Sequence, residues 1–416
     1  MPHPGRGRRR PSLPLRWRRY PQPVPALRGR DRAIVGAALA LSVALVGCAG
    51  PAQRATPGSA IPAPSMSSLP PTPTQCSNQT VLAGWSTARL AAQLVVVPAP
   101  EADVAAAAAA VAQGAGGVVL FGSAAPADLG SQIRALDARA PESIHPLVMT
   151  DEEGGGVQRM ANLVGSMPWA RQMGSTMSPP TIQRLAEAVG QRLRALGVTM
   201  DLAPVLDVDG GNGPNTRDPD GARSFSADPA QAARDGIAFA TGLLAAGVIP
   251  VVKHFPGLGG ASGNTDYGPA ATRPYSSLLS TGLLPFEQAV AAGLPAVLVS
   301  NASVPGLTAG PASLSPAAIQ GLLEGRLQFH GLVMTDSLSA PAITAVGLTV
   351  PQAAVRAVAA GADLVMFSSG QPGPVLPEIE AALARAEATG EISSARLIDA
   401  ADQVLVAKGV SLCRPG

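Results

Sequence analysis

Residues 251–266 read V-V-K-H-F-P-G-L-G-G-A-S-G-N-T-D, and the interpretation of the whole chain starts from them. An apolar run, 248–252, leads into adjacent Lys253 and His254, and a glycine-rich loop follows. Glycine lets a backbone approach a ligand closely, and long irregular loops in compact domains are usually functional. An isolated Lys-His pair is usually solvated surface, but this loop favours a site. The stretch therefore predicts a buried strand that delivers polar groups to a ligand.

Short apolar runs like this one recur along the chain and alternate with longer Ala-, Leu- and Arg-rich stretches of helical period. This alternation predicts parallel strands joined by crossover helices. Eight such units over the folded part match a single (β/α)8 TIM barrel, with a doubly wound sheet as the alternative. We expect no second domain after residue 76. The eight expected strands are 94–97, 117–121, 146–150, 198–203, 249–253, 296–300, 332–335 and 363–367.

Start and stop signals support the helices between these strands. Asp228-Pro229 and Ser315-Pro316 each place a capping side chain before a proline that suits the first turn. Glycines that can adopt a left-handed cap precede three of the strands. These glycines are Gly247, Gly293 and Gly361.

Polar residues gather where the expected strands end. The chemistry of a TIM barrel lies at the carboxyl ends of its strands, so these side chains are expected to surround one mouth. One acid at a strand end is often a loop cap, but capping does not explain so many over consecutive strands. The residues are Asp151, Asp201, Asp207, Lys253, His254, Asn301 and Asp336.

The types of residue at these strand ends limit the reactions that the site could catalyse. Metal hydrolysis needs clustered His and acids, yet only His145, His254 and His330 follow the leader, and no H-x-H or H-E-x-x-H spacing occurs. We therefore expect no metal and no cofactor. A Schiff base on Lys253 would need an apolar pocket, whereas its neighbours are charged. Paired carboxylates with hydroxyl-binding Lys, Arg and His are the equipment of a glycosidase.

Four motifs resemble the bacterial β-N-acetylglucosaminidases of glycoside hydrolase family 3, and their consistent order over residues 95–336 makes the resemblance specific. A shorter match is PASLS at 311–315. The four motifs are TDEEGGGVQR at 150–159, ARSFS at 222–226, KHFPGLG at 253–259 and GLVMTDSL at 331–338.

The resemblance implies roles for individual residues. Asp336 would be the nucleophile, and the sugar in the −1 subsite would be bound by Asp151, Arg223, Lys253 and His254. Typical members carry an Asp-Ser-His segment whose histidine is the general acid/base, whereas this chain has Asn-Thr-Asp ending at Asp266.

Other family histidines are also replaced, by Leu258 and Asn301. We therefore expect Asp266 to supply the proton, because it occupies the position of the histidine. If it does not, another acid does, with Glu152, Glu153, Asp201 and Asp207 as candidates, or catalysis is impaired.

Charge is distributed unevenly along the chain. Residues 1–47 hold ten of the 30 basic residues and one of the 28 acidic ones, so the remaining chain carries 20 basic and 27 acidic residues, a formal charge of −7. A folded part of this sign has no electrostatic basis for binding nucleic acid.

The same N-terminal region predicts export. Its apolar run, 33–46, is shorter than the roughly 20 residues of a spanning helix and fits a signal-peptide core. The run ends in Leu-Val-Gly-Cys, which resembles a bacterial lipobox, so we expect cleavage after residue 47 and lipidation of Cys48. An ordinary secretion signal is the alternative. The expected location is extracytoplasmic, with a lipid anchor as the only membrane attachment.

Residues 48–75 are rich in Pro, Ser, Ala and Thr, a composition that does not bury apolar surface and predicts a tether. The barrel domain is then 76–416. Cys76 and Cys413 lie near its two ends, and in an oxidising compartment such a pair is expected to form a disulfide, with two free thiols as the alternative.

We therefore expect an anchored, exo-acting, retaining β-N-acetylglucosaminidase that removes terminal GlcNAc from β-1,4-linked peptidoglycan fragments during cell-wall turnover. The location follows from the lipobox and the sugar from the family resemblance. A family 3 β-glucosidase and a phosphorylase are the enzymatic alternatives. A sugar-binding lipoprotein with impaired catalysis is an alternative of another class, suggested by the missing histidine.

Overall fold

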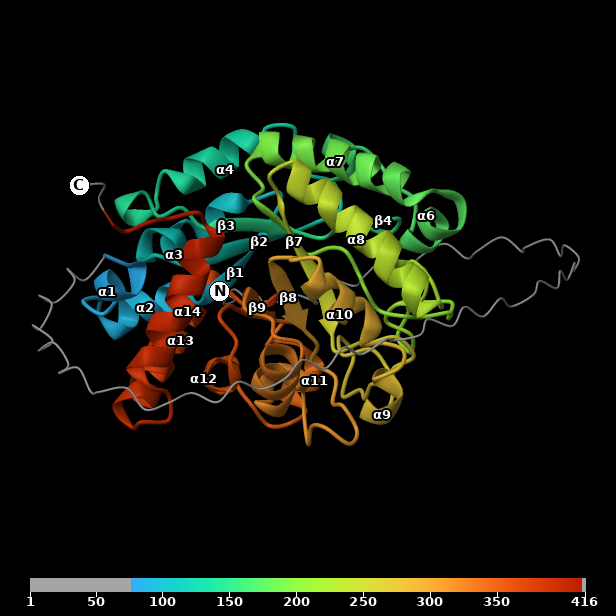
Figure 1. The fold of residues 1–416 in the computed structure, drawn as a ribbon. Coiled ribbons are helices and arrows are strands. Elements are labelled where there is room, and N and C mark those ends of the chain that lie inside the picture. Colours follow the sequence, from blue (N-terminus) through green and yellow to red (C-terminus); the bar gives the residue numbers. More distant parts are fainter. Residues whose placement is uncertain (1–75, 414–416) are drawn as a thin grey trace, which may run out of the picture. The chain divides into compact units, whose positions relative to one another are not determined.

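The computed structural model describes residues 76–413 (Figure 1). The expected signal peptide 1–47, Cys48 and the expected tether 48–75 lie outside the described residues. Within 76–413, no helix combines the length and the apolar character that a membrane crossing needs.

Eight parallel strands form one sheet in the order β10-β1-β2-β3-β6-β7-β8-β9. The two end strands also meet, through a parallel bridge between Met334 and Leu364, so the sheet closes. This closure confirms the TIM barrel and rules out the open doubly wound sheet. The strands are β1 (Val95–Pro100), β2 (Gly117–Phe121), β3 (Leu147–Thr150), β6 (Met200–Asp201), β7 (Ile249–Phe255), β8 (Ala296–Val299), β9 (Leu332–Thr335) and β10 (Val365–Met366).

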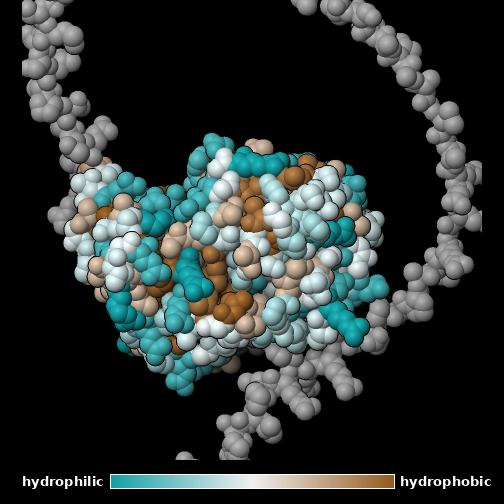
Figure 2. All heavy atoms as spheres, turned by 90° about the horizontal axis from the view of Figure 1, so that it is seen from below, coloured by the Kyte–Doolittle hydropathy of each residue, from teal (hydrophilic) through white to brown (hydrophobic). Residues whose placement is uncertain are grey.

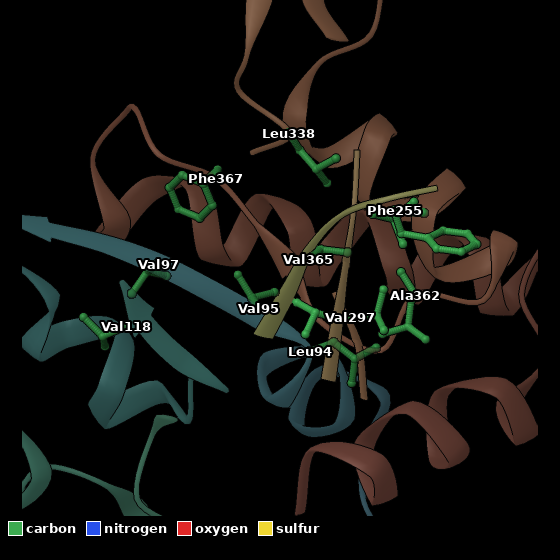
Figure 3. Packing of buried hydrophobic residues seen from close by; sticks show 14 of the residues in the cluster. Leu94, Val95, Val97, Val118, Phe255, Val297, Leu338, Ala362, Val365 and Phe367 are labelled. Carbon is green, nitrogen blue, oxygen red and sulfur yellow. The ribbon is translucent and has the colours of Figure 1, made fainter. Parts of the chain in front are cut away.

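Alternation along the strands produces two apolar layers, because successive side chains point to opposite faces. Val96, Met149 and Met334 belong to the cluster that fills the barrel interior. Val95 and Val97 belong to the larger cluster between the strands and the surrounding helices, part of which is seen in Figure 3. Close packing of both layers holds the strand ends at fixed positions, which the site requires.

Helices surround the strands, as the ribbon in Figure 1 shows. The longer ones are α4 (Leu129–Asp137), α7 (Pro179–Leu196), α8 (Pro229–Ala245), α10 (Leu284–Ala291), the π-helix η5 (Ala317–Arg326), α12 (Val350–Ala360), α13 (Pro372–Ala388) and α14 (Ser394–Ala407). The shorter ones are α1 (Asn78–Leu82), α2 (Thr87–Gln93), η1 (Val104–Ala107), α3 (Ala108–Gln113), η2 (Pro141–Ser143), α5 (Ala161–Val164), α6 (Ala170–Thr176), η3 (Gly221–Arg223), α9 (Tyr275–Leu278), η4 (Ala312–Leu314) and α11 (Pro341–Thr344).

The expected helix signals are found with one exception. The Asp228 side chain accepts the N–H of Gln231 at the start of α8, and the three expected glycines have positive φ. Ser315 does not cap the next helix, because η5 begins at Ala317 after Pro316 and has no side-chain cap. The π-type hydrogen bonds of η5 differ from the α-helical period on which the prediction rested.

One face of the molecule, shown in Figure 2, mixes hydrophilic and hydrophobic residues, and the most hydrophobic ones lie near its middle. Among residues 76–413, the exposed large hydrophobic side chains include Tyr267 and Val406.

The two ends of the described chain are joined. A disulfide links Cys76 to Cys413. The Asn78 amide adds a second connection, because its Nδ2 donates to the carbonyl of Val410 at 3.0 Å and its Oδ1 accepts the N–H of Leu412 at 2.7 Å.

Candidate active site

A short hairpin follows β3 and positions two of the acids. Its strands, β4 (Glu152–Glu153–Gly154) and β5 (Val157–Gln158), pair antiparallel directly after Asp151. Neighbouring residues of a strand point to opposite sides, so Glu152 and Glu153 diverge. Glu152 accepts hydrogen bonds from Gln158 Nε2 and the N–H of Met160, whereas Glu153 turns toward β7.

Lys253 and Arg223 are fixed by these acids. Lys253 Nζ lies 2.8 Å from Asp151 Oδ1 and 2.6 Å from Glu153 Oε1. Arg223, at the end of η3, bonds Glu153 with two nitrogens, each at 2.8 Å. A paired arrangement of this kind fixes the plane of the guanidinium as well as its position. The structure thus brings together three sugar-binding residues expected from the sequence, namely Asp151, Arg223 and Lys253.

The opposite charges of these neighbouring side chains determine which of them are protonated. Burial alone would raise the pKa of both carboxyls, but Lys253 and Arg159 hold the pKa of Asp151 below its usual range. Arg223 and Lys253 likewise lower the pKa of Glu153 to about 2 despite burial. Burial favours a neutral Lys253, yet the two carboxylates raise its pKa. Lys253 therefore stays an ammonium, which excludes the Schiff-base chemistry considered above.

Arg159 joins the same network. Its Nη2 lies 3.2 Å from Asp151 Oδ2, and its guanidinium carbon lies 5.7 Å from the centre of the Phe121 ring. Arg159 is the last residue of the motif at 150–159, and the sequence alone indicated no role for it. Its spacing of eight residues from Asp151 gave no signal, because only the hairpin turn brings the two side chains together.

His254 is held by a second pair of acids. Its Nδ1 lies 2.6 Å from Asp207 Oδ2, and Asp207 also accepts the N–H groups of His254 and Leu258. Because two backbone N–H groups already donate to it, Asp207 acts as an acceptor, and His254 Nδ1 carries the proton between them. Burial and the nearby Arg223 lower the pKa of His254 to about 4, which keeps the imidazole neutral at neutral pH.

Asp220 was not expected from the sequence. It is fully buried, neither carboxyl oxygen has a hydrogen-bond partner, and Oδ1 lies 3.7 Å from Arg223 Nη1. Burial and the facing Asp207 carboxyl raise its pKa well above the usual range. Asp220 is therefore the protonated member of this pair of acids. It lies in a loop of Gly, Asn, Pro and Asp residues, whose composition indicated only a turn.

Asp207, Asp220 and His254 are also the described residues whose geometry comes nearest to a metal site, with ligand atoms within 4.8 Å of one another. The Arg223 guanidinium lies 3.4 Å from His254 Nε2 and 3.7 Å from Asp220. A fixed positive charge so close opposes a second cation. We therefore interpret these three residues as part of the ion-pair and hydrogen-bond network.

Asp336 lies immediately after β9 and is partly exposed. Its backbone N–H donates to the carbonyl of Val299 at 3.0 Å, and its Oδ1 accepts the N–H of Ser337 at 2.6 Å. Burial raises its pKa, His254 opposes that shift, and Asp266 adds to it. The effect of Asp266 on Asp336 shows that these two expected site residues lie within electrostatic range.

Asp266 occupies a different environment from the other acids. It is exposed on the loop after β7, where its N–H donates to Asn264 Oδ1 at 3.0 Å. The alternative acids Glu152, Glu153, Asp201 and Asp207 are all buried and already accept backbone or side-chain donors. Asp266 is thus the acid of this set that is accessible to a leaving group.

Comparison with known proteins identifies the family. The family profile described as the glycosyl hydrolase family 3 N terminal domain matches residues 88–407. The chain belongs to glycosyl hydrolase family 3. The resemblance drawn from the motifs is therefore confirmed, and the chain is a glycoside hydrolase.

Relatives of this family 3 chain include the beta-hexosaminidase LpqI of Mycobacterium tuberculosis, 35% identical over 370 residues that cover 86% of this chain and 92% of the relative. A family 3 glycosyl hydrolase structure from Mycobacterium smegmatis is 36% identical, has a TM-score of 0.72 and covers 79% of this chain and 99% of its own. A β-N-acetylhexosaminidase structure from Beutenbergia cavernae is 31% identical and has a TM-score of 0.71. It covers 79% of this chain and 100% of its own.

Proposed function

We propose that this family 3 hydrolase is an exo-acting, retaining β-N-acetylglucosaminidase with Asp336 as its nucleophile. The observation that carries the proposal is the position of Asp336, partly exposed after β9, with one carboxyl oxygen held by Ser337 and with His254 and Asp266 within electrostatic range. The sugar specificity is supported by relatives named as hexosaminidases.

Two displacements complete the reaction. An Asp336 oxygen attacks the anomeric carbon, the bond to the leaving oxygen breaks, and Asp266 gives that oxygen its proton. In the second step Asp266 takes a proton from water, whose oxygen attacks the anomeric carbon and releases Asp336 as a carboxylate. Two inversions at one carbon give overall retention. No cofactor takes part in either step.

The network described above binds the sugar in this proposal. Lys253 and Arg223 are donors that Glu153 holds in place, and His254 is a neutral ring fixed by Asp207. Asp151 supplies acceptor oxygens. Charge-assisted hydrogen bonds from such groups are stronger than those between neutral partners, and their fixed geometry reduces the entropy lost on binding.

The proposed substrate is a GlcNAc-containing muropeptide, and the proposed location is the outer side of the cell membrane, with the chain anchored through lipidated Cys48. The location rests on the lipobox-like sequence before Cys48 and on its Pro- and Ser-rich continuation. The GlcNAc part of the substrate is supported by the relatives named as hexosaminidases, and its origin in the cell wall follows from the proposed location. Metabolic labelling with a radioactive fatty acid tests the anchor. We expect label in the wild type and none in Cys48→Ser; equal labelling of the two overturns it.

The decisive test of activity is hydrolysis of the GlcNAc–MurNAc disaccharide, with products identified by mass. We expect free GlcNAc with β configuration at early times. Release of a sugar phosphate only when phosphate is present would identify a phosphorylase, and faster cleavage of aryl glucosides than of aryl GlcNAc would identify a β-glucosidase. Binding without any release would identify a catalytically impaired sugar-binding lipoprotein, the possibility raised by the missing histidine.

A further inference from the structure

The segment that carries Asp336 is held by a buried amide side chain. This side chain belongs neither to the sugar-binding network nor to the two reacting carboxyls, Asp336 and Asp266. Asn301 follows β8 and is 1% exposed. Its Nδ2 donates to the carbonyl of Ser337 at 2.7 Å, and its Oδ1 accepts the hydroxyl of Ser313 at 2.6 Å. Because a carbonyl only accepts, the amide nitrogen must face Ser337, which fixes the orientation of the side chain.

Ser313 is itself held firmly. It lies in η4, is fully buried, and its N–H donates to the carbonyl of Ser300 at 2.9 Å. The turn that contains Ser313 is therefore attached to the end of β8, and Ser313 supports Asn301 from a rigid position.

Ser337 connects Asn301 to the Asp336 carboxylate. Asn301 holds its carbonyl, while the N–H of Ser337 donates to Asp336 Oδ1 at 2.6 Å. On the other side, the Ser337 hydroxyl lies 2.7 Å from Ser368 Oγ and accepts the N–H of Ser368 at 3.1 Å. Because Ser337 is held at both its carbonyl and its side chain, rotation about the bonds to its Cα is restrained, and its N–H stays directed at Oδ1.

We infer that Asn301, supported by Ser313, is a positioning residue for the nucleophile: it fixes Ser337, whose N–H binds Oδ1 of Asp336 and leaves Oδ2 as the attacking oxygen. The inference rests on the proposed role of Asp336. An amide suits this place because it offers one donor and one acceptor and does not titrate across the working pH range.

The test compares Asn301→Leu, which keeps the volume and removes the amide, with Ser313→Ala, which removes a single oxygen. For an aryl GlcNAc substrate we expect Asn301→Leu to lower kcat by about 10- to 100-fold, the loss typical of a reacting group displaced by about an ångström, with KM little changed. Ser313→Ala should lower kcat by a smaller factor than Asn301→Leu does. Ser313→Thr, which keeps the hydroxyl, should have a kcat close to that of the wild type.

A pH profile separates positioning from a general structural role. The Ser337 N–H stabilises the ionised form of Asp336, so loosening it raises the pKa of that carboxyl. The acid limb of kcat/KM should therefore move to higher pH in both variants. The matched control is Asn78→Leu, which removes an amide that likewise donates through its nitrogen and accepts through its oxygen, but next to the disulfide. It should lower the melting temperature and leave the acid limb in place.

The outcomes distinguish the two proposals. Trapping the wild type with an activated 5-fluoro-GlcNAc glycoside and mapping the labelled peptide tests Asp336 itself; label elsewhere would end the proposed mechanism and the inference with it. If Asp336 is labelled but both variants keep the wild-type kcat and acid limb, only the inference is wrong. If Asn301→Leu does not fold, Ser313→Ala still decides the question.

Discussion

At the scale of single residues, the structure separates acids that carry charge from acids that are kept neutral. Asp151 and Glu153 are ionised by their cationic neighbours, whereas burial raises the pKa values of Glu152 and Asp201. The sequence placed several of these acids at strand ends but could not distinguish their roles, because each role depends on partners from other strands.

Asp336→Asn should reduce turnover by several orders of magnitude, because the amide cannot form the glycosyl-enzyme. Folding should be intact, since the partly exposed side chain contributes little to the core. Steady-state kinetics and a thermal melt check both points. Turnover within ten-fold of wild type would exclude Asp336 as the nucleophile.

Asp266→Ala should abolish cleavage of the disaccharide and spare the first step with a dinitrophenyl glycoside, because only a poor leaving group needs a proton. Added azide should then speed turnover and yield a β-glycosyl azide. Pre-steady-state kinetics with both substrates provide the measurement. Equal losses on the two substrates, with no response to azide, would mean that Asp266 only orders its loop.

Asp201→Asn should stabilise the protein at neutral pH. Burial raises the folded-state pKa of Asp201 above its unfolded value of about 3.9. The contribution of this carboxyl to the free energy of unfolding is therefore complete below about pH 3.9 and is lost as the pH rises toward the folded-state pKa. The amide keeps the acceptor for the N–H of Glu152. Thermal melts from pH 4 to 8 should show a gain over wild type that grows with pH. A collapse of activity would instead identify Asp201 as the missing acid.

At the scale of elements, the local sequence was sufficient to predict the strands of the barrel but not the structure of the segments that connect them. Every expected strand overlaps an observed one, since β-branched and apolar runs report burial directly. The hairpin β4–β5 was not expected, because its Glu- and Gly-rich sequence lacks strand character. Pairing there is imposed by the burial of Glu152 and Glu153, a tertiary effect.

Gly154→Ala tests how far that hairpin determines the site. Gly154 has φ +104, and an added Cβ would lie 2.3 Å from the carbonyl oxygen of Pro168. We expect a loss of about 1–3 kcal/mol from the strained conformation, with a raised KM because Glu153 no longer aligns Lys253 and Arg223. Gly373→Ala, in α13 with nothing near its added Cβ, is the control and should leave KM unchanged. An unchanged KM in Gly154→Ala would show that the hairpin does not position the cations.

At the scale of the whole molecule, eight recurring units were enough to predict the barrel, but the charge network was not predictable. It joins residues from three successive units, with Asp151 and Glu153 after β3, Asp207 and Arg223 after β6, and Lys253 and His254 in β7. Their spacing along the chain carries no information about which side chains touch. The parallel pairing of β3, β6 and β7 as neighbours in the sheet brings these strand ends together.

Cys76→Ser together with Cys413→Ser should lower stability by about 3 to 5 kcal/mol in the chain-entropy model, in which cross-linking removes freedom from the unfolded chain. Activity at low temperature should be retained, because the site lies on other elements. A melting temperature equal to that of wild type under non-reducing conditions would show that the bridge contributes nothing.

The same bridge gives residues 76–413 the topology of a ring. A protease that cuts one exposed loop opens the ring but releases no fragment, so the nicked enzyme stays one covalent molecule whose parts can re-form the barrel at high local concentration. On a gel it would run as a single species until a reductant is added and then separate into two. Damage from one cut is thus converted from loss of a fragment into a repairable break.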